Sequence, residues 1–165
     1  MATGDTLLSL NPLSSEPPAT AYATLDSRNN HPVLNFDAAN DESTYFSAIL
    51  PRNYSGNGLT AYLHWAAAEA TTGTVKWEAA FERMSDGTTD IDSNAFATAK
   101  AASAATVPGT SGFVEETTIA FSNSEIDGIV VGDSFRLMVT RDANHSTDDT
   151  AAGFAQLLMV ELKET

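Results

Sequence analysis

Two acidic loops carry the residues best suited to bind a metal ion. They are Asp86, Asp90 and Asp92 in the first loop, and Asp142, Asn144, Asp148 and Asp149 in the second. Calcium takes about six to eight oxygen ligands from carboxylates and carbonyls, which such loops supply. Neither loop has the ordered spacing of an EF-hand or its terminal bidentate glutamate. The pattern favours solvated charges over calcium ligands, so no metal and no cofactor is predicted.

The three histidines offer no catalytic arrangement. His31 precedes a proline, His64 lies in an alternating stretch, and His145 lies in the second acidic loop. General-base catalysis needs a partner that orients the imidazole, and the sequence identifies none. The chain contains no cysteine and no histidine pair at zinc-ligand spacing. P-loop, dinucleotide-binding and nucleophile-elbow motifs are absent as well, and the sequence predicts a protein that is not an enzyme.

Aromatic side chains are candidates for a sugar-stacking surface. The candidates are Tyr45, Tyr54, Tyr62, Trp65 and Trp77. The alternation described below places both tryptophans on inward faces, which favours a role in the core. An aromatic surface outside the core would instead favour carbohydrate binding.

The stretch from residue 59 to 83 predicts two strands that each have one buried face. Leu59, Ala61, Leu63 and Trp65 alternate with Thr60, Tyr62, His64 and Ala66, and after Gly73 the residues Val75, Trp77, Ala79 and Phe81 alternate with Lys76, Glu78, Ala80 and Glu82. A period of two is typical of a strand that packs one face on a core. With a further stretch at 133–140, the pattern predicts five core anchors: Trp65, Trp77, Phe81, Phe135 and Leu137.

Similar short stretches predict the other strands of an all-β domain. They are 21–27, 32–36, 43–50, 114–121, 133–140 and 154–162. About eight strands punctuated by turns, without a βαβ rhythm, predict a β-sandwich. The long connection from 86 to 112 favours a jelly-roll or Greek-key topology over a simple meander. Within it, 93–102 suits either a short alanine-rich helix or an irregular crossover.

The first twenty residues are expected to form an extended N-terminal arm ahead of a sandwich domain at 21–165. Pro17 and Pro18 favour polyproline II and exclude a central strand. A disordered terminus is the alternative. If the arm lies on a neighbouring subunit, its anchors are expected to be Leu7, Leu8, Leu10 and Leu13.

Composition limits the partners of the chain. A length of 165 residues suits one domain, and a net charge of −14 disfavours binding to nucleic acid. The first ten residues lack the basic and apolar regions of a signal peptide, and no stretch has the ~20 apolar residues of a membrane helix. A soluble protein without nucleic-acid or membrane partners is expected.

Several short segments together resemble small β-sandwich virion structural proteins of tailed bacteriophages. They are 34–37 (LNFD), 45–46 (YF), 50–54 (LPRNY), 63–65 (LHW), 75–78 (VKWE), 133–137 (DSFRL) and 140–142 (TRD). The resemblance covers most of 31–162 and implies a capsid decoration, or cement, protein without catalytic residues or cofactors. Such a protein is made in the host bacterial cytoplasm, binds the major capsid protein on the virion surface as a homotrimer, and stabilises the head. The alternative is a carbohydrate-binding or host-attachment module of a phage fibre, with a small hydrolase as a distant third.

Overall fold

The computed structural model describes residues 4–165, and almost all regular structure in this range is β-strand. In chain order the strands are β1 (Thr6–Leu10), β2 (Thr24–Arg28), β3 (His31–Phe36), β4 (Glu42–Ile49), β5 (Leu59–Ala67), β6 (Thr74–Val75), β7 (Trp77–Met84), β8 (Lys100–Ala101), β9 (Ala105–Thr106), β10 (Val114–Phe121), β11 (Ser134–Arg141) and β12 (Ala155–Glu164). A single 3-10 turn, η1 (Pro12–Ser14), follows β1. Within the described range, no helix has the length and apolar character to cross a membrane.

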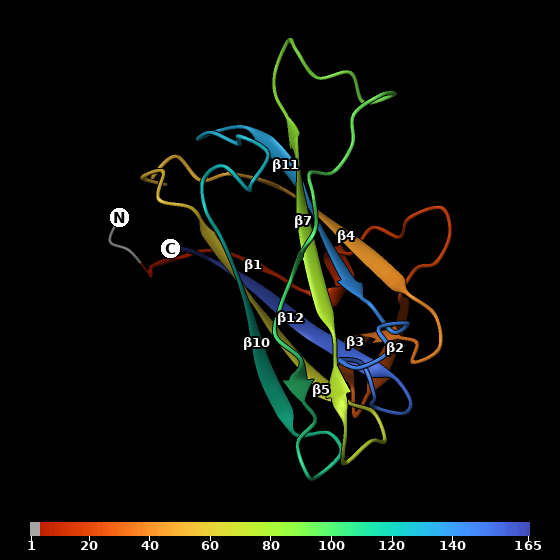
Figure 1. Cartoon of the computed structure of the whole chain (residues 1–165). Coiled ribbons are helices and arrows are strands. Elements are labelled where there is room, and N and C mark those ends of the chain that lie inside the picture. Colours follow the sequence, from red (N-terminus) through yellow and green to blue (C-terminus); the bar gives the residue numbers. More distant parts are fainter. Residues whose placement is uncertain (1–3) are drawn as a thin grey trace.

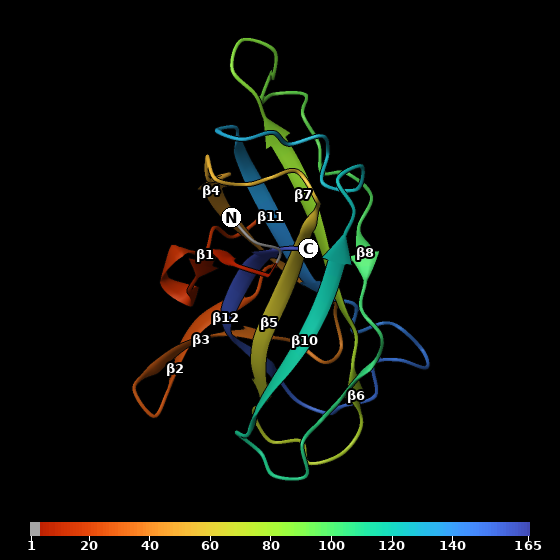
Figure 2. The ribbon, with the colours of Figure 1, turned by 90° about the vertical axis from the view of Figure 1, so that its left-hand side faces the viewer.

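Two antiparallel sheets face each other and form a β-sandwich. The first has six strands in the order β10-β5-β12-β3-β2, with β1 paired to the second half of β12. The second has four strands in the order β4-β11-β7-β8, and β6 and β9 form a small separate ladder. Figure 2 shows β12, β5 and β10 side by side in front of β11 and β7. The predicted all-β sandwich of jelly-roll type is confirmed, with twelve strands rather than about eight.

The core lies between the two sheets, and its centre is aromatic. The five anchors Trp65, Trp77, Phe81, Phe135 and Leu137 are all fully buried. The ring of Trp77 contacts Phe36 edge-on at 5.0 Å and Trp65 at 5.9 Å between centroids. The indole nitrogen of Trp65 donates to Thr117 Oγ1 at 2.9 Å, so this polar atom is satisfied inside the core.

The N-terminal segment differs from the expected arm, because β1 is a strand of the six-stranded sheet. Leu8 is paired with Leu162 and Leu10 with Val160 of β12 (Figure 1). Leu10 is buried and Leu7 and Leu8 pack against the same core, whereas Leu13 is 71% exposed. The prolines follow β1 and do not interrupt it, so Leu7, Leu8 and Leu10 pack against the core of their own chain. The division into an arm at 1–20 and a domain at 21–165 is therefore corrected for Thr6–Leu10.

The long crossover between β7 and β10 contains no helix in its described residues. Asn94 Nδ2 donates to the carbonyl of Arg83 at 2.7 Å, and the Ala97 amide donates to the carbonyl of Phe81 at 2.8 Å. These hydrogen bonds hold the irregular segment around Asn94 and Ala97 against the edge of β7. Of the two alternatives left by the sequence, the irregular crossover is the one observed.

Candidate functional site

The outer face of the six-stranded sheet carries a regular grid of side chains, and we refer to it as the outer face. Antiparallel pairing aligns three rows across β10, β5 and β12: Val114–Ala66–Gln156, Glu116–His64–Met159 and Thr118–Tyr62–Glu161. Successive rows are two residues apart, so the three rows extend over about 13 Å along the strands. The core lies on the other side of the sheet, which leaves this face open to a partner.

A pocket of about 330 Å³ lies at the first row, and we call it the Arg28 pocket. Its lining residues are Arg28, Asn29, His31 and Val33 from the β2–β3 hairpin, Ala66 from β5, Gln156 and Leu158 from β12, and Gly112 and Val114 at the start of β10. Its volume is at the lower end of the range for ligand pockets. It combines apolar side chains with a few polar groups, which is the usual composition of a small-ligand site.

A bulge in β12 shapes the pocket. The pairing of β12 with β5 shifts register between Leu157 and Met159, so Leu158 is an extra residue in the ladder. Such a bulge bends a strand and redirects its side chains. Leu158 lines the pocket, whereas its neighbour Leu157 is buried in the core.

A chain of hydrogen bonds fixes the guanidinium of Arg28 in the pocket. Nη1 of Arg28 donates to Oε1 of Gln156 at 2.7 Å and to the carbonyl of Ala67 at 3.0 Å. Nε2 of Gln156 donates to Oδ1 of Asn35 at 2.8 Å, and Nδ2 of Asn35 donates to Oδ2 of Asp26 at 2.9 Å. Because both amides use their oxygen and their nitrogen, the chain has one orientation and holds Arg28 in place.

Gly112 makes room for the guanidinium. Its φ of +81° lies in the left-handed region, which glycine adopts without strain. A Cβ atom built on it would lie 2.7 Å from Nη2 of Arg28. Only glycine therefore fits both the backbone conformation and the arginine side chain at this position.

Apart from Met159, the side chains of the second and third rows of the outer face are polar, and the third row carries a tyrosine. His64 Nε2 lies 3.7 Å from a carboxylate oxygen of Glu116, which is too long for a hydrogen bond. The ammonium of Lys163 lies 4.8 Å from the ring centroid of Tyr62. These rows extend the surface from the Arg28 pocket with groups that both donate and accept hydrogen bonds.

The aromatic candidates from the sequence do not form one surface. Trp65, Trp77 and Tyr54 are buried, and Tyr62 alone of the five is on the outer face. Tyr45 is on the opposite sheet, where its ring packs on Phe96. The guanidinium of Arg136 covers both of these rings and pairs with Glu82. The faces of these rings are therefore already in contact with a side chain of the same protein.

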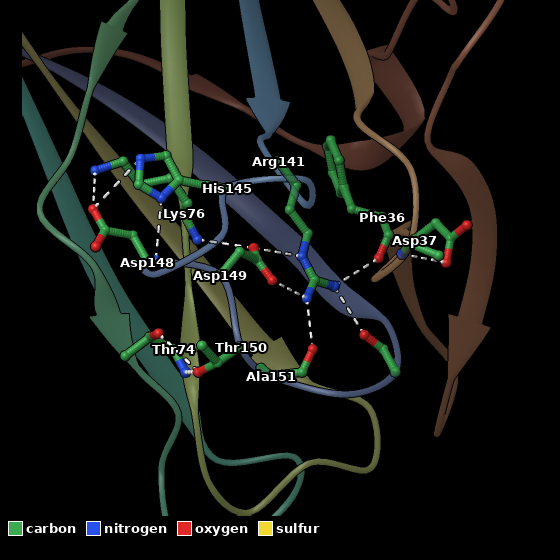
Figure 3. A network of polar contacts seen from close by, with 12 residues as sticks. Phe36, Asp37, Thr74, Lys76, Arg141, His145, Asp148, Asp149, Thr150 and Ala151 are labelled. Atoms are coloured by element: carbon green, nitrogen blue, oxygen red, sulfur yellow. Dashed lines mark hydrogen bonds and ion pairs between the residues drawn. The ribbon is translucent and has the colours of Figure 1, made fainter.

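A buried ion pair holds the second acidic loop in place (Figure 3). Arg141 and Asp149 have fully buried side chains and form a two-point contact, with Nη2–Oδ1 at 2.7 Å and Nε–Oδ2 at 2.9 Å. Arg141 also donates to the carbonyls of Phe36, Ala151 and Gly153. The expectation of solvated charge is wrong for Asp149, because a guanidinium neutralises it.

Asp148 is also paired. Nζ of Lys76 donates to Oδ2 of Asp148 at 2.8 Å, and this hydrogen bond lowers the pKa of the carboxyl. In the first loop, Asp90 Oδ1 accepts from the amide of Asp92. Among residues 4–165, no three acidic or histidine side chains converge at metal-binding distance.

Calcium is expected to leave the thermal stability unchanged. The carboxylates best placed in the second loop, Asp148 and Asp149, already have cationic partners that a metal would have to displace. Melting curves in excess calcium and in excess chelator should have the same midpoint. A calcium-dependent rise in Tm would show a bound ion and would contradict this assignment.

The residues of the Arg28 pocket were missed from the sequence. Arg28 and Asn29 lie between the predicted strands at 21–27 and 32–36, and Asn35 and Gln156 lie within predicted strands. One signal was present: polar Asn35 and Gln156 interrupt strands that are otherwise apolar around them. Their convergence depends on long-range pairing, since Asn35 is opposite Gln156 across a separation of 121 residues.

No protein-family model matches the chain, and no curated protein matches it by sequence. Solved structures match its fold. The CBM22-2 xylan-binding domain of Xyn10C from Paenibacillus barcinonensis is 12% identical, with a TM-score of 0.51 and coverage of 92% of both chains. The xylan-binding module CBM15 is 8% identical, with a TM-score of 0.51 and coverage of 96% of this chain and 97% of that one.

Two further matches are much longer than this chain. The chain spans 28% of a Clostridium thermocellum endo-1,4-β-D-xylanase 10B structure with CBM22-1 and GH10 modules, complexed with xylohexaose, at 11% identity, 97% coverage of this chain and a TM-score of 0.50. It spans 29% of an exo-β-1,3-galactanase from Phanerochaete chrysosporium. The neighbours that the chain covers almost completely are binding modules rather than catalytic domains.

These neighbours correct the functional expectation from the sequence. They are β-sandwich carbohydrate-binding modules and not phage capsid proteins. The predicted β-sandwich is supported, and the assignment as a capsid decoration protein is contradicted. Short segments such as 34–37 and 75–78 coincide with β3 and with the β6–β7 region. They reflect strands that pack in a sandwich, and a shared fold does not imply a shared function.

Proposed function

We propose that this chain is a non-catalytic carbohydrate-binding module, and that its outer face binds a polysaccharide. The observation that carries the proposal is the Arg28 pocket, which opens onto three aligned rows of mostly polar side chains. Xylan is the first polymer to test, because two neighbours of the same length are described as xylan-binding. The fold alone does not specify a ligand, so the ligand is inferred from the chemistry of the site.

The chemistry of the pocket suits a sugar. A pyranose ring presents C–H groups on its faces and hydroxyl groups around its edge. Val114 and Leu158 provide apolar contact, while Arg28, held in place by Gln156, provides a fixed polar group. Polar groups that are held in place before binding lose little conformational entropy when a ligand arrives. Further sugar units would extend along the His64 and Tyr62 rows.

Affinity electrophoresis through gels containing soluble xylan tests the proposal, with starch as the comparison polymer. Val114→Glu should weaken retardation by about tenfold or more, because its carboxylate would pair with Arg28 and occupy the pocket. Val114 is 60% exposed, so this variant is expected to fold.

Val130→Glu is the matched control. Val130 is also exposed, lies before β11, and receives the same change of charge. It should bind like the unmodified protein. Equal retardation of the two variants, or no retardation of the unmodified protein by any polysaccharide tested, would contradict the proposed function.

A further inference from the structure

Arg28 is exceptional among the basic residues of this acidic chain. Six of the eight lysine and arginine side chains lie within ion-pair distance of a carboxylate: Lys76, Arg83, Lys100, Arg136, Arg141 and Lys163. In the described residues, Arg28 and Arg52 have no such partner. Arg52 is exposed to solvent, whereas Arg28 is half-buried and lines a pocket. A half-buried cation without a carboxylate is unusual where acids outnumber bases 22 to 8.

The contacts of Arg28 neutralise none of its charge. Its two acceptors, the amide oxygen of Gln156 and the carbonyl of Ala67, are both uncharged and both bind Nη1. A guanidinium has five N–H donors, and within residues 4–165 no protein acceptor bonds to Nε or Nη2. The positive charge and three donors therefore have no partner among the described residues.

The surroundings of Arg28 favour an anion. None of the described residues that line the pocket is an aspartate or glutamate, and His31 is a further donor. Asp26 is the nearest acid along β2, but Asn35 and Gln156 separate it from the guanidinium. The net charge of the whole chain is −14, but charges more than about 8–10 Å from Arg28 are largely screened at physiological ionic strength.

We propose that the Arg28 pocket selects sugars that carry a carboxylate, so that the preferred polysaccharide contains uronic acid. This inference rests on the proposed carbohydrate-binding function and deepens it. The carboxylate of a uronic acid would accept hydrogen bonds from the free donors of Arg28, and the sugar ring would contact Val114 and Leu158. Arginine binds carboxylates with two parallel hydrogen bonds, which adds specificity as well as affinity.

The test compares glucuronoxylan with the same polymer after chemical reduction of its carboxyl groups. The two polymers share their backbone and differ only in charge. Calorimetric titration of the unmodified protein should show binding to the acidic polymer that is tighter by about tenfold or more. This preference should shrink as salt is raised, because salt screens the ion pair.

Three variants test whether Arg28 causes the preference for the acidic polymer. Arg28→Gln should bind both polymers with similar affinity, whereas Arg52→Gln, which removes the other unpaired cation, should keep the preference of the unmodified protein. Gly112→Ala should weaken the preference as well, because its methyl group displaces the guanidinium. Thermal melts of each variant show whether it is folded.

The outcomes separate the two proposals. Equal binding of both polymers by the unmodified protein would overturn the preference for uronic acid and leave carbohydrate binding intact. Binding of neither polymer would overturn the preference for uronic acid, and the absence of retardation by every polysaccharide in the gels would overturn carbohydrate binding as well. A preference that persists in folded Arg28→Gln would place the recognition of the carboxylate elsewhere and would also overturn the inference.

Discussion

Replacing Arg141 by methionine is expected to lower the free energy of unfolding by about 3–5 kcal/mol. The substitution removes a fully buried guanidinium and leaves the Asp149 carboxylate without its counter-ion. It also removes the donors for the carbonyls of Phe36, Ala151 and Gly153. Chemical denaturation at neutral pH measures the change.

Two further variants show whether the ion pair is the cause. Arg52→Met changes an exposed arginine and should alter stability by less than about 0.5 kcal/mol. Arg141→Met combined with Asp149→Leu should be less destabilised than Arg141→Met alone, since no unpaired charge remains. Recovery should be partial, because Asp149 also accepts the amide of Lys76. A loss below about 1 kcal/mol for Arg141→Met would contradict the buried pair.

Trp77→Ala should also destabilise the protein by about 3–5 kcal/mol. Trp77 is fully buried and contacts the rings of Phe36 and Trp65, which belong to the facing sheet. Truncation leaves a cavity between the two sheets, where no neighbour can move in without breaking the strand pairing.

Equilibrium unfolding of three variants tests whether the side chain of Trp77 packs in the core. Trp77→Phe keeps an aromatic ring and should lose less stability than Trp77→Ala. Leu25→Ala changes a 51% exposed side chain on β2 and should have a small effect. If Trp77→Ala behaved like Leu25→Ala, the strand register that places Trp77 inward would be wrong.

The alternation of apolar residues predicted most of the sandwich. Period-two patterns appear wherever one face of a strand is buried, so β5, β7 and β11 were visible in the sequence. The two-residue strands β6, β8 and β9 are too short to show any period. β1 was missed because its place depends on pairing with β12, at least 150 residues away.

The same alternation also indicated the buried ion pair of Arg141. Phe135, Leu137 and Val139 point inward, and the next position of this pattern is Arg141. An inward arginine at the end of a strand predicts a buried carboxylate partner. For the Arg28 pocket, polar Asn35 and Gln156 within apolar strands were the one signal, and they did not show which residues meet, since the pocket residues come from four separate parts of the chain.

The central claim is that the outer face of the six-stranded sheet binds carbohydrate, and amide chemical-shift mapping tests it most directly. The labelled protein would be titrated with an oligosaccharide of the polymer that retards it most. The largest shifts are expected at Ala66, Gly112 and Gln156, and none at Tyr45 or Arg136 on the opposite sheet. Shifts centred on the opposite sheet, or no shifts at a saturating concentration of the oligosaccharide, would contradict it.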